Sequence, residues 1–377
     1  MKILMLNFEF PPLGGGASPL SFDLAKEIIK EGHEIDVVTM NFKGLKKYEN
    51  IKGINIHRVK CIRKHKEYSK SSELLTYIFP ALAKAIQLHK KKNYDINHTH
   101  FIIPTGITSY LLKKITGLPY VITSHGSDVP NYNPDRFKIG HKFIGPVWKK
   151  IIDNSEGITT PSEYLKGLIL KKYNNPNKIE VIPNGIKIDE ETKKDKQKKI
   201  LYAGRLLERK GVQYIIEAIK NLDLKGYKFE IIGDGPYRKE LEQKAKEIEN
   251  ILFKGWISQE ELKEIYEESE IFVIPSTQES FGMVIAEAME KNMAVICGKG
   301  SACEEVIGKT GIAINPKSSN EIRNALKFYI NNPKEKEKAM KFGRERVTKL
   351  FNIKKITSQY IEVYSRIINA NKAKITK

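Results

Sequence analysis

Short apolar runs alternate along the chain with longer segments of helical periodicity. The runs contain few polar residues, as strands do when helices cover both faces of a parallel sheet. They are IDVVTM (35–40), YVITSH (120–125), KILYAG (199–204), KFEIIG (228–233), EIFVIP (270–275) and MAVIC (293–297). Amphipathic segments with helical spacing lie at 21–32, 212–222 and 237–249. The alternation predicts an α/β protein with doubly wound parallel sheets.

The length of the chain predicts two domains. It has 377 residues, 40% of them hydrophobic, which is more than one core usually organises. The charged segment ETKKDKQKK (191–199) has no apolar residue and predicts a linker at the domain boundary. We therefore expect two Rossmann-like domains that face each other across a cleft, over residues 1–187 and 188–352.

The net charge of the chain limits the classes of partner that it is expected to bind. Sixty-five Lys and Arg against 45 Asp and Glu give a net charge of +20, which attracts nucleic acid, an acidic membrane surface or phosphorylated substrates. A composition adapted to a high growth temperature, or a biased genome, explains the same charge without any partner. A basic nucleic-acid-binding protein is an alternative function. No recognisable reader motif is present, so we expect no specific nucleic acid partner.

The sequence favours a cytoplasmic protein. No run approaches the roughly 20 apolar residues that a membrane-spanning helix needs. The N-terminal MKILMLNFEF is typical of a strand and lacks a signal-peptide cleavage pattern. Cys61, Cys297 and Cys303 form neither a disulfide framework nor a metal-binding cluster, so we expect reduced, structural thiols.

A glycine-rich loop follows the first predicted strand. In PPLGGGASP, Ser18 is the expected N-cap of a helix and Pro19 its first residue. The backbone amides of Gly15 and Gly16 are then free to approach a phosphate or a sugar. Ordinary turn chemistry explains the glycines equally well, because the spacing is not the G-x-G-x-x-G of a dinucleotide-binding loop.

A second strand-to-helix loop carries cations. AGRLLERKG (203–211) places Arg205 and Lys210 at the sheet edge where open α/β sheets bind ligands. Two cations there suit a diphosphate, and solvated surface charge is the simpler alternative.

ESFGMVIAE (279–287) separates two carboxylates by eight positions. If a helix begins near Phe281, Glu279 lies in the loop before it and Glu287 at most about 12 Å further along. The intervening amides suit a phosphate, while the carboxylates accept hydrogen bonds from sugar hydroxyls. This arrangement predicts a nucleotide sugar as ligand. The alternative is a helix-dipole partner, Glu279, and a solvated helix residue, Glu287. The amides belong to Ser280, Phe281, Gly282, Met283 and Val284.

In order and spacing these elements resemble the family-4 retaining glycosyltransferases of the glycosyltransferase B fold. The resemblance covers nearly the whole chain, and its most specific element is the Glu-x7-Glu motif formed by Glu279 and Glu287. The other matching segments are PPLGGGA, HGSD (125–128), PNGI (183–186), GRLLERKG, IIGDGP (231–236) and FKGWIS (253–258).

The resemblance implies that the protein moves a hexosyl group from a nucleotide-diphosphate sugar to an unidentified glycan, lipid-linked or phosphorylated acceptor. It implies an acceptor-side first domain, onto which 353–377 packs back, and a donor-binding second domain. The implied roles cover the donor sugar (Glu279, His125, Gly15 and Gly16), the ribose (Glu287), the diphosphate (Arg205 and Lys210) and the base (Trp256 and Ile257). By itself, a histidine after a strand such as His125 is more often structural.

Three positions depart from the family pattern. Lys187 follows PNGI where the family often has Asp. Asn292 replaces a glycine after the Glu-x7-Glu helix, and Asn is the next-best residue for a left-handed helix end. GKGSACEEVI (298–307) replaces the usual glycine-rich turn, with Glu305 at the position of the family's Glu.

We expect no metal and no cofactor. The chain has no D-x-D pair to grip a divalent cation, so protein cations must stabilise the leaving group. A nucleotide-sugar epimerase or a phosphorylase-like enzyme on the same fold is an alternative that would share the donor site.

The acceptor side of the sequence is rich in cations. The segments 57–70, 89–92 and 135–150 are basic, and the last also holds Phe137, Phe143 and Trp148. Cations with interfacial aromatic residues suit a lipid-phosphate acceptor or a peripheral position at the inner face of the membrane. A solvated basic face with ordinary core aromatics is the alternative.

Overall fold

The computed structural model describes residues 1–130, 132, 141–191, 195–220 and 222–375, and the chain divides into two compact units. Unit 1 consists of Met1–Gly185 and Ile353–Lys377, and unit 2 of Ile186–Asn352. The first crossing thus lies two residues before the expected boundary at 187/188.

The sequence predicted that the charged segment 191–199 is the linker between the domains. The segment instead lies inside unit 2. Its last three residues begin strand β9 (Gln197–Ala203), and residues 192–194 lie outside the described residues. The crossing is set earlier because Ile186 is buried in the core of unit 2 and its amide donates to the Phe351 carbonyl. Apolar contacts, not charge, therefore decide where the chain changes units.

The sheet of unit 1 is parallel except for one edge hairpin. Its order is β3 (Tyr48–Ile51), β4 (Ile54–Val59), β2 (Glu34–Met40), β1 (Lys2–Leu6), β5 (Ile96–His100), β6 (Tyr120–Thr123), β7 (Gly157–Thr160) and β8 (Ile179–Val181). Only the β3–β4 pair is antiparallel among these strands. The strand order reverses between β1 and β5, which makes this pair the topological switch point.

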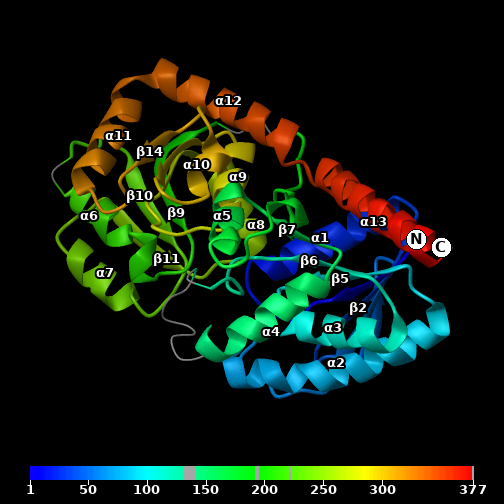
Figure 1. Cartoon of the computed structure of the whole chain (residues 1–377). Helices are drawn as coiled ribbons and strands as arrows, with labels where there is room; N and C mark the ends of the chain where they lie inside the picture. The colour runs from blue at the N-terminus through cyan, green and yellow to red at the C-terminus, as the bar shows by residue number, and fades with distance from the viewer. Residues whose placement is uncertain (131, 133–140, 192–194, 221, 376–377) are drawn as a thin grey trace. The chain divides into compact units, whose positions relative to one another are not determined.

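Alternation along β1 explains why helices cover both faces of this sheet. Ile3 and Met5 pack with residues of α1 (Ala17–Lys30) and α13 (Ile353–Ile375), whereas Leu4 and Leu6 pack with residues of α2 (Ser71–Lys92). In Figure 1, α13 (red) lies beside α1 (blue) although the two are far apart in sequence. The remaining helices of unit 1 are α3 (Thr105–Thr116), α4 (His141–Asn154), α5 (Glu163–Leu170) and the short η1 (Pro176–Lys178).

Unit 2 has a fully parallel sheet. Its order is β11 (Ile251–Gly255), β10 (Lys228–Ile232), β9, β12 (Ser269–Ile274), β13 (Ala294–Gly298) and β14 (Ile312–Ile314), with the switch point between β9 and β12. Its helices are η2 (Glu208–Lys210), α6 (Val212–Ile219), α7 (Arg238–Ala245), α8 (Gln259–Glu268), α9 (Met283–Glu290), α10 (Cys303–Ile307), α11 (Ser319–Asn331) and α12 (Pro333–Leu350). The predicted α/β class with two doubly wound sheets is confirmed.

Two predicted helix starts are wrong by two residues. Helix α1 begins at Ala17 with Gly16 as N-cap, so Ser18 lies inside its first turn and makes no capping bond. Helix α9 begins at Met283, because Gly282 takes the left-handed conformation with φ of 99° and ends the loop. Asn292 does adopt the left-handed conformation expected after α9, with φ of 53°.

Buried polar contacts tie α13 to the sheet of unit 1. The Tyr364 hydroxyl lies within hydrogen-bond distance of Nδ1 of His98, at 2.7 Å, and Nε2 of His98 lies 2.7 Å from the Thr123 hydroxyl. The Tyr360 hydroxyl lies 3.2 Å from the same Thr123 oxygen. All four side chains are buried, so each polar atom depends on its partner in place of water.

We expect Tyr364→Phe to lower the free energy of unfolding by about 1 to 3 kcal/mol, because it leaves Nδ1 of His98 buried without its hydrogen-bond partner. Denaturant titration followed by circular dichroism measures the loss. Tyr48→Phe is the matched control, since it removes an exposed hydroxyl that bonds Asn55, and it should cost less than about 0.5 kcal/mol. Equal losses in the two variants would show that the Tyr364 contact contributes nothing special.

Candidate functional site

The loops that follow β9 and β12 meet at the switch point of unit 2. Lys210, at the end of the first loop, forms an ion pair with the carboxylate of Glu279 in the second. The amide of Thr277 donates to the Arg209 carbonyl at 3.0 Å and holds the two loops together. Gly211 permits this approach, because a Cβ there would lie 2.4 Å from the Pro275 oxygen. Both side chains of the ion pair are largely buried.

Arg205 lies on the same loop as Lys210 but in a different environment. It is exposed, and its guanidinium makes no hydrogen bond or ion pair with any residue that the structure describes. A backbone hydrogen bond holds this loop in place, because the Leu206 amide donates to the Asp234 carbonyl at 2.9 Å. Gly233 and Gly235 allow this contact, because a Cβ on either would lie within 2.2 Å of a carbonyl oxygen of the loop. Of the two predicted cations, Lys210 is thus already paired and Arg205 is open to a ligand.

Helix α9 begins at Met283, four residues after Glu279. The amides of Gly282, Met283 and Val284 make no hydrogen bond with any described residue, whereas those of Ile285 and Ala286 donate to the Gly282 carbonyl. Unbonded amides at a helix N-terminus favour an anion. Phe281 is not exposed to a ligand but buried, with its ring 5.2 Å from that of Phe351. Its side chain therefore anchors the loop.

Glu287 lies on the first turns of α9 with an uncommitted carboxylate. Its side chain is half-buried and makes no hydrogen bond with any residue in the described part of the chain. Burial, assisted by the nearby charge of Glu290, raises the pKa of Glu287 from 4.5 to about 7. A carboxylate held without partners in this way suits a ligand that donates hydrogen bonds, such as a vicinal diol.

Trp256 and Ile257 follow β11, two strands from the switch point. The Trp256 side chain is 80% exposed, so its ring is available for stacking. Ile257 packs partly against the core of unit 2. Over the part of the chain that the structure describes, neither side chain makes a hydrogen bond or ion pair with the switch-point loops.

In unit 1, His125 lies beyond the end of β6 and contacts His100, the last residue of β5. Nε2 of His125 and Nδ1 of His100 share a hydrogen bond of 2.9 Å. Burial lowers the pKa of His125 to about 4 and that of His100 well below its usual 6.5. Both imidazoles are therefore neutral near pH 7. The sequence NHTH at 97–100 was the only signal for His100, and sequence reasoning missed it.

Asp128 of the HGSD motif holds this loop in place. Its carboxylate accepts hydrogen bonds from the amides of Ile102, His125 and Gly126, at 2.8 to 3.1 Å, and from the Ser124 hydroxyl. Burial raises the pKa of Asp128 despite these bonds, which act to lower it. The motif therefore fixes the backbone of His125 to the end of β5.

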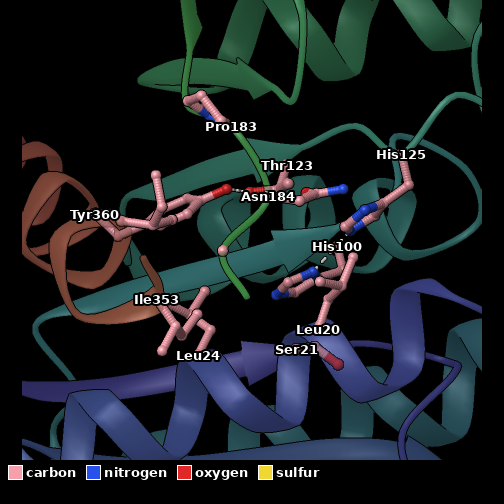
Figure 2. A pocket seen from close by; sticks show the side chains of 12 residues that line it. Leu20, Ser21, Leu24, His100, Thr123, His125, Pro183, Asn184, Ile353 and Tyr360 are labelled. Atoms are coloured by element: carbon pink, nitrogen blue, oxygen red, sulfur yellow. Dashed lines mark hydrogen bonds between the residues drawn. The ribbon is translucent and has the colours of Figure 1, made fainter. Parts of the chain in front are cut away.

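A small pocket adjoins this pair of histidines (Figure 2). It encloses about 310 Å³ including its opening to solvent. Its lining comes from α1, the ends of β5 and β6, the 183–185 loop and α13, and consists of Leu20, Ser21, Leu24, His100, Thr123, His125, Pro183, Asn184, Gly185, Ile353, Ile356 and Tyr360. All of them belong to unit 1.

Gly15 and Gly16 lie where the chain enters α1. A Cβ on either would meet no atom within 4 Å, so packing does not require glycine at these positions. Gly14 differs, because its φ of 98° and a Cβ contact of 2.6 Å with Glu9 do require glycine. The Gly15 amide, however, already donates to the Glu9 carboxylate at 3.3 Å, so the prediction that it is free is wrong, and only the Gly16 amide has no hydrogen bond with a described residue.

The aromatic residues of the basic segments only partly match the predicted membrane-interface role. Trp148 is not an interfacial aromatic, because it is 3% exposed and its Nε1 donates to the Asp128 carbonyl at 3.1 Å. Phe137 lies outside the described residues, and Phe143 belongs to α4. Within the described ranges, no helix combines the length and apolarity needed to cross a membrane. Cys61, Cys297 and Cys303 are free thiols, as predicted.

Two family models match the chain. Residues 14–190 match the model described as Glycosyltransferase Family 4, and residues 185–346 the model described as Glycosyl transferases group 1. An uncharacterised glycosyltransferase of Methanocaldococcus jannaschii, MJ1607, is 31% identical, with 85% of this chain and 87% of the relative covered.

Solved structures of glycosyl-transferring proteins share the fold. Sucrose-phosphate synthase from Thermosynechococcus elongatus superposes with a TM-score of 0.82 at 20% identity, covering 98% of this chain and 100% of that one. Anabaena HepE in complex with UDP superposes with a TM-score of 0.80 at 19% identity, covering 97% of this chain and 100% of that one.

The raised pKa of Glu287 predicts a pH-dependent stability. The folded protein binds the proton of Glu287 more tightly than the unfolded chain does. Protonation of Glu287 therefore adds to the free energy of unfolding; this contribution is complete below pH 4.5 and is lost as pH rises through 7. Glu287→Gln cannot ionise. Relative to wild type, its free energy of unfolding should therefore rise by up to about 3 kcal/mol between pH 4.5 and pH 8.

Denaturant titrations at several pH values measure this difference. The matched control is Glu264→Gln, which changes an exposed carboxylate of α8 and should show no comparable pH-dependent gain. A Glu287→Gln curve parallel to that of wild type would mean that Glu287 is not held in a desolvated site.

Proposed function

The chain belongs to glycosyltransferase family 4, with the glycosyltransferase B fold, and from this premise we propose that it is a retaining, metal-independent hexosyltransferase. Its donor is a nucleotide-diphosphate sugar. The observation that carries the proposal is the grouping, at one switch point, of Arg205, the Lys210–Glu279 pair, the open amides of α9 and the unpaired carboxylate of Glu287. These groups match phosphates in the middle and hydroxyls at both ends.

The diphosphate is the leaving group of the proposed reaction. As the bond between the anomeric carbon and the phosphate oxygen breaks, negative charge grows on the departing phosphate. Arg205, Lys210 and the amides of Gly282 to Val284 stabilise that charge and lower the barrier. A metal ion is not needed in this scheme, because the protein's own cations replace it.

The acceptor hydroxyl attacks the anomeric carbon from the face that the phosphate leaves. The new bond joins the acceptor oxygen to the sugar, and the hydroxyl proton passes to the departing phosphate oxygen. We favour this front-face route, with retention of configuration, because no carboxylate is an evident nucleophile: Glu279 is committed to Lys210.

Glu279 and Glu287 have separate roles in this proposal. Glu279 accepts hydrogen bonds from donor-sugar hydroxyls while Lys210 holds its carboxylate in place. Glu287 accepts from the ribose hydroxyls, which supply the donors that it lacks in the free protein. We assign Trp256 and Ile257 to the base, and His125, Gly15 and Gly16 of unit 1 to the donor sugar.

Complexes of a protein with the same fold support a nucleotide-sugar donor. HepE has been solved with UDP and with UDP-glucose. This chain shares that fold, and its switch-point groups fit the same class of ligand. Binding measurements identify the nucleotide base and the sugar of the donor.

A thermal-shift panel in the presence of EDTA tests donor binding. It compares UDP, GDP, ADP, CMP and their sugar conjugates. One nucleoside diphosphate and its sugar should raise the melting temperature, equivalent to about 2.7 kcal/mol at a hundredfold excess over Kd. Arg205→Ala should weaken the shift, while Arg366→Ala, which changes an exposed arginine of α13, should not. A shift that requires magnesium would contradict metal independence.

Turnover with the donor so identified tests the chemistry. Glu279→Ala should lower kcat on the order of a hundredfold, the scale typical of a lost transition-state contact, while the protein stays folded. Glu217→Ala, an exposed carboxylate of α6, is the control. Nuclear magnetic resonance of the product reads its anomeric configuration. Interconversion of donors, or a requirement for inorganic phosphate, would indicate the epimerase or phosphorylase alternative.

We place the acceptor at an anionic lipid surface, docked through a basic apolar patch on unit 1. The patch comprises Ile62, Leu75 and Phe79 with Lys64, Lys66 and Lys70. Its three apolar side chains are 58%, 59% and 71% exposed, and Leu75 and Phe79 lie one turn apart on α2. The Ile62 amide donates to the Thr76 hydroxyl at 3.0 Å, which brings the lysine-rich segment against the same turn. Exposed apolar groups among cations suit an anionic headgroup layer.

Flotation with vesicles of phosphatidylglycerol and phosphatidylcholine tests this patch. The wild type should float with the vesicles at low salt, and Phe79→Ser should lose most of that binding. Phe328→Ser changes an exposed aromatic of unit 2 and should not alter flotation. If wild type fails to float, or if Phe328→Ser loses as much as Phe79→Ser, the patch is not a membrane-docking surface.

A further inference from the structure

His100 has one ring nitrogen that the catalytic scheme leaves unexplained. Its side chain is 2% exposed, and its Nε2 atom is buried with no hydrogen-bond partner among the described residues. Figure 2 shows the His100 ring bonded to His125 through one nitrogen, with the other directed into the pocket. Buried polar atoms without partners are rare, so this one constrains where the protons of the histidine pair lie.

The neighbours of this nitrogen are already occupied. The Ser21 hydroxyl accepts from the Asn7 amide at 2.9 Å and donates to the Ser18 carbonyl at 2.9 Å. The Tyr360 and Thr123 hydroxyls bond each other within the His98 network. The remaining lining includes the polar Asn184 of the 183–185 loop, and its side chains from α1 and α13 are chiefly aliphatic. No described side chain lies where it accepts a proton from Nε2 of His100.

Two arrangements of protons are available to the neutral pair. In the first, His125 donates from Nε2, and His100 must then carry a buried N–H on its own Nε2 with no acceptor. In the second, His100 donates from Nδ1, so that its Nε2 is a bare lone pair and His125 carries its proton on Nδ1. A buried N–H without an acceptor is the rarer defect, since under-satisfied acceptors are tolerated better. The second arrangement is the one that the pocket favours.

We propose that His100 is a positioning residue that holds His125 in the tautomer protonated on Nδ1, so that His125 presents a hydrogen-bond donor to its ligand. Nδ1 of His125 makes no hydrogen bond with any described residue and His125 is not fully buried, so this N–H is open to a ligand. Asp128 fixes the backbone of His125, and His100 fixes its protons. The inference concerns the donor-sugar contact of His125 and to that extent rests on the proposed function.

The tautomer determines what His125 can recognise. An N–H donor bonds an oxygen that has a free lone pair, such as a hydroxyl or a carboxylate, and rejects a group that can only donate, such as an ammonium. The reverse tautomer would accept from either a hydroxyl or an ammonium. His100 thereby acts on specificity without itself touching the substrate.

Two substitutions separate the nitrogens of His100. The Asn side chain of His100→Asn ends near the position of Nδ1 and can still donate to His125. The Gln side chain of His100→Gln reaches the position of Nε2 and loses the bond to His125. In protein labelled with ¹⁵N-histidine, the ring-nitrogen shifts distinguish a protonated from a bare nitrogen. The wild type and His100→Asn should show His125 protonated on Nδ1, and His100→Gln should show a shift toward Nε2.

Steady-state kinetics with the donor provide the second readout. His100→Gln should lower kcat about tenfold with a smaller change in KM, and His100→Asn should recover most of that loss. Finding His125 protonated on Nε2 in the wild type, or the same tautomer in all three proteins, would overturn the proposal. If His100→Gln and His125→Ala both keep full activity while His100→Gln still shows the tautomer shift, the donor-sugar role of His125 is refuted instead.

Discussion

The reversal of strand order within each parallel sheet is the constraint on which the rest of the structure depends. At β9 and β12 the two connections leave in opposite directions, so the loops beyond their carboxyl ends are adjacent without a helix between them. Lys210 and Glu279, 69 residues apart in sequence, meet there as an ion pair. The same reversal at β1 and β5 in unit 1 puts His100 at an open sheet edge.

The close approach of these loops is possible only because the backbone is bare at selected positions. Gly211, Gly233 and Gly235 lie where a Cβ would fall within 2.4 Å of a carbonyl oxygen. Gly282 has a different role, since its left-handed conformation turns the chain into α9 and leaves the first amides of that helix without acceptors. Glycines thus shape the cation-bearing loop and the anion-binding helix start together.

Burial favours the neutral form of titratable groups in both units. In unit 1, His98, His100 and His125 are kept neutral because desolvation lowers their pKa values. In unit 2, desolvation raises the pKa of Glu287, a carboxylate without partners. The histidines are therefore neutral hydrogen-bonding groups, and the Glu287 carboxyl makes no hydrogen bond with a described residue. In the function that we propose, both features serve recognition of hydroxyl-rich ligands.

The sequence by itself determined the α/β class, the doubly wound sheets and the loops that carry Arg205, Lys210 and Glu279, because apolar runs and turn residues are local signals. It placed the unit boundary within two residues but gave the charged segment 191–199 as the linker, whereas the crossing is set by Ile186, which enters the core of unit 2 and bonds Phe351, far away in sequence. It left open whether Trp148 is an interfacial or a core aromatic, and packing against Val129 and its neighbours buries it. Only the tertiary structure decided that Lys210 is paired while Arg205 is open, and that His100 lies within hydrogen-bond distance of His125. Those outcomes depend on which side chains share a desolvated space, and no local pattern records that.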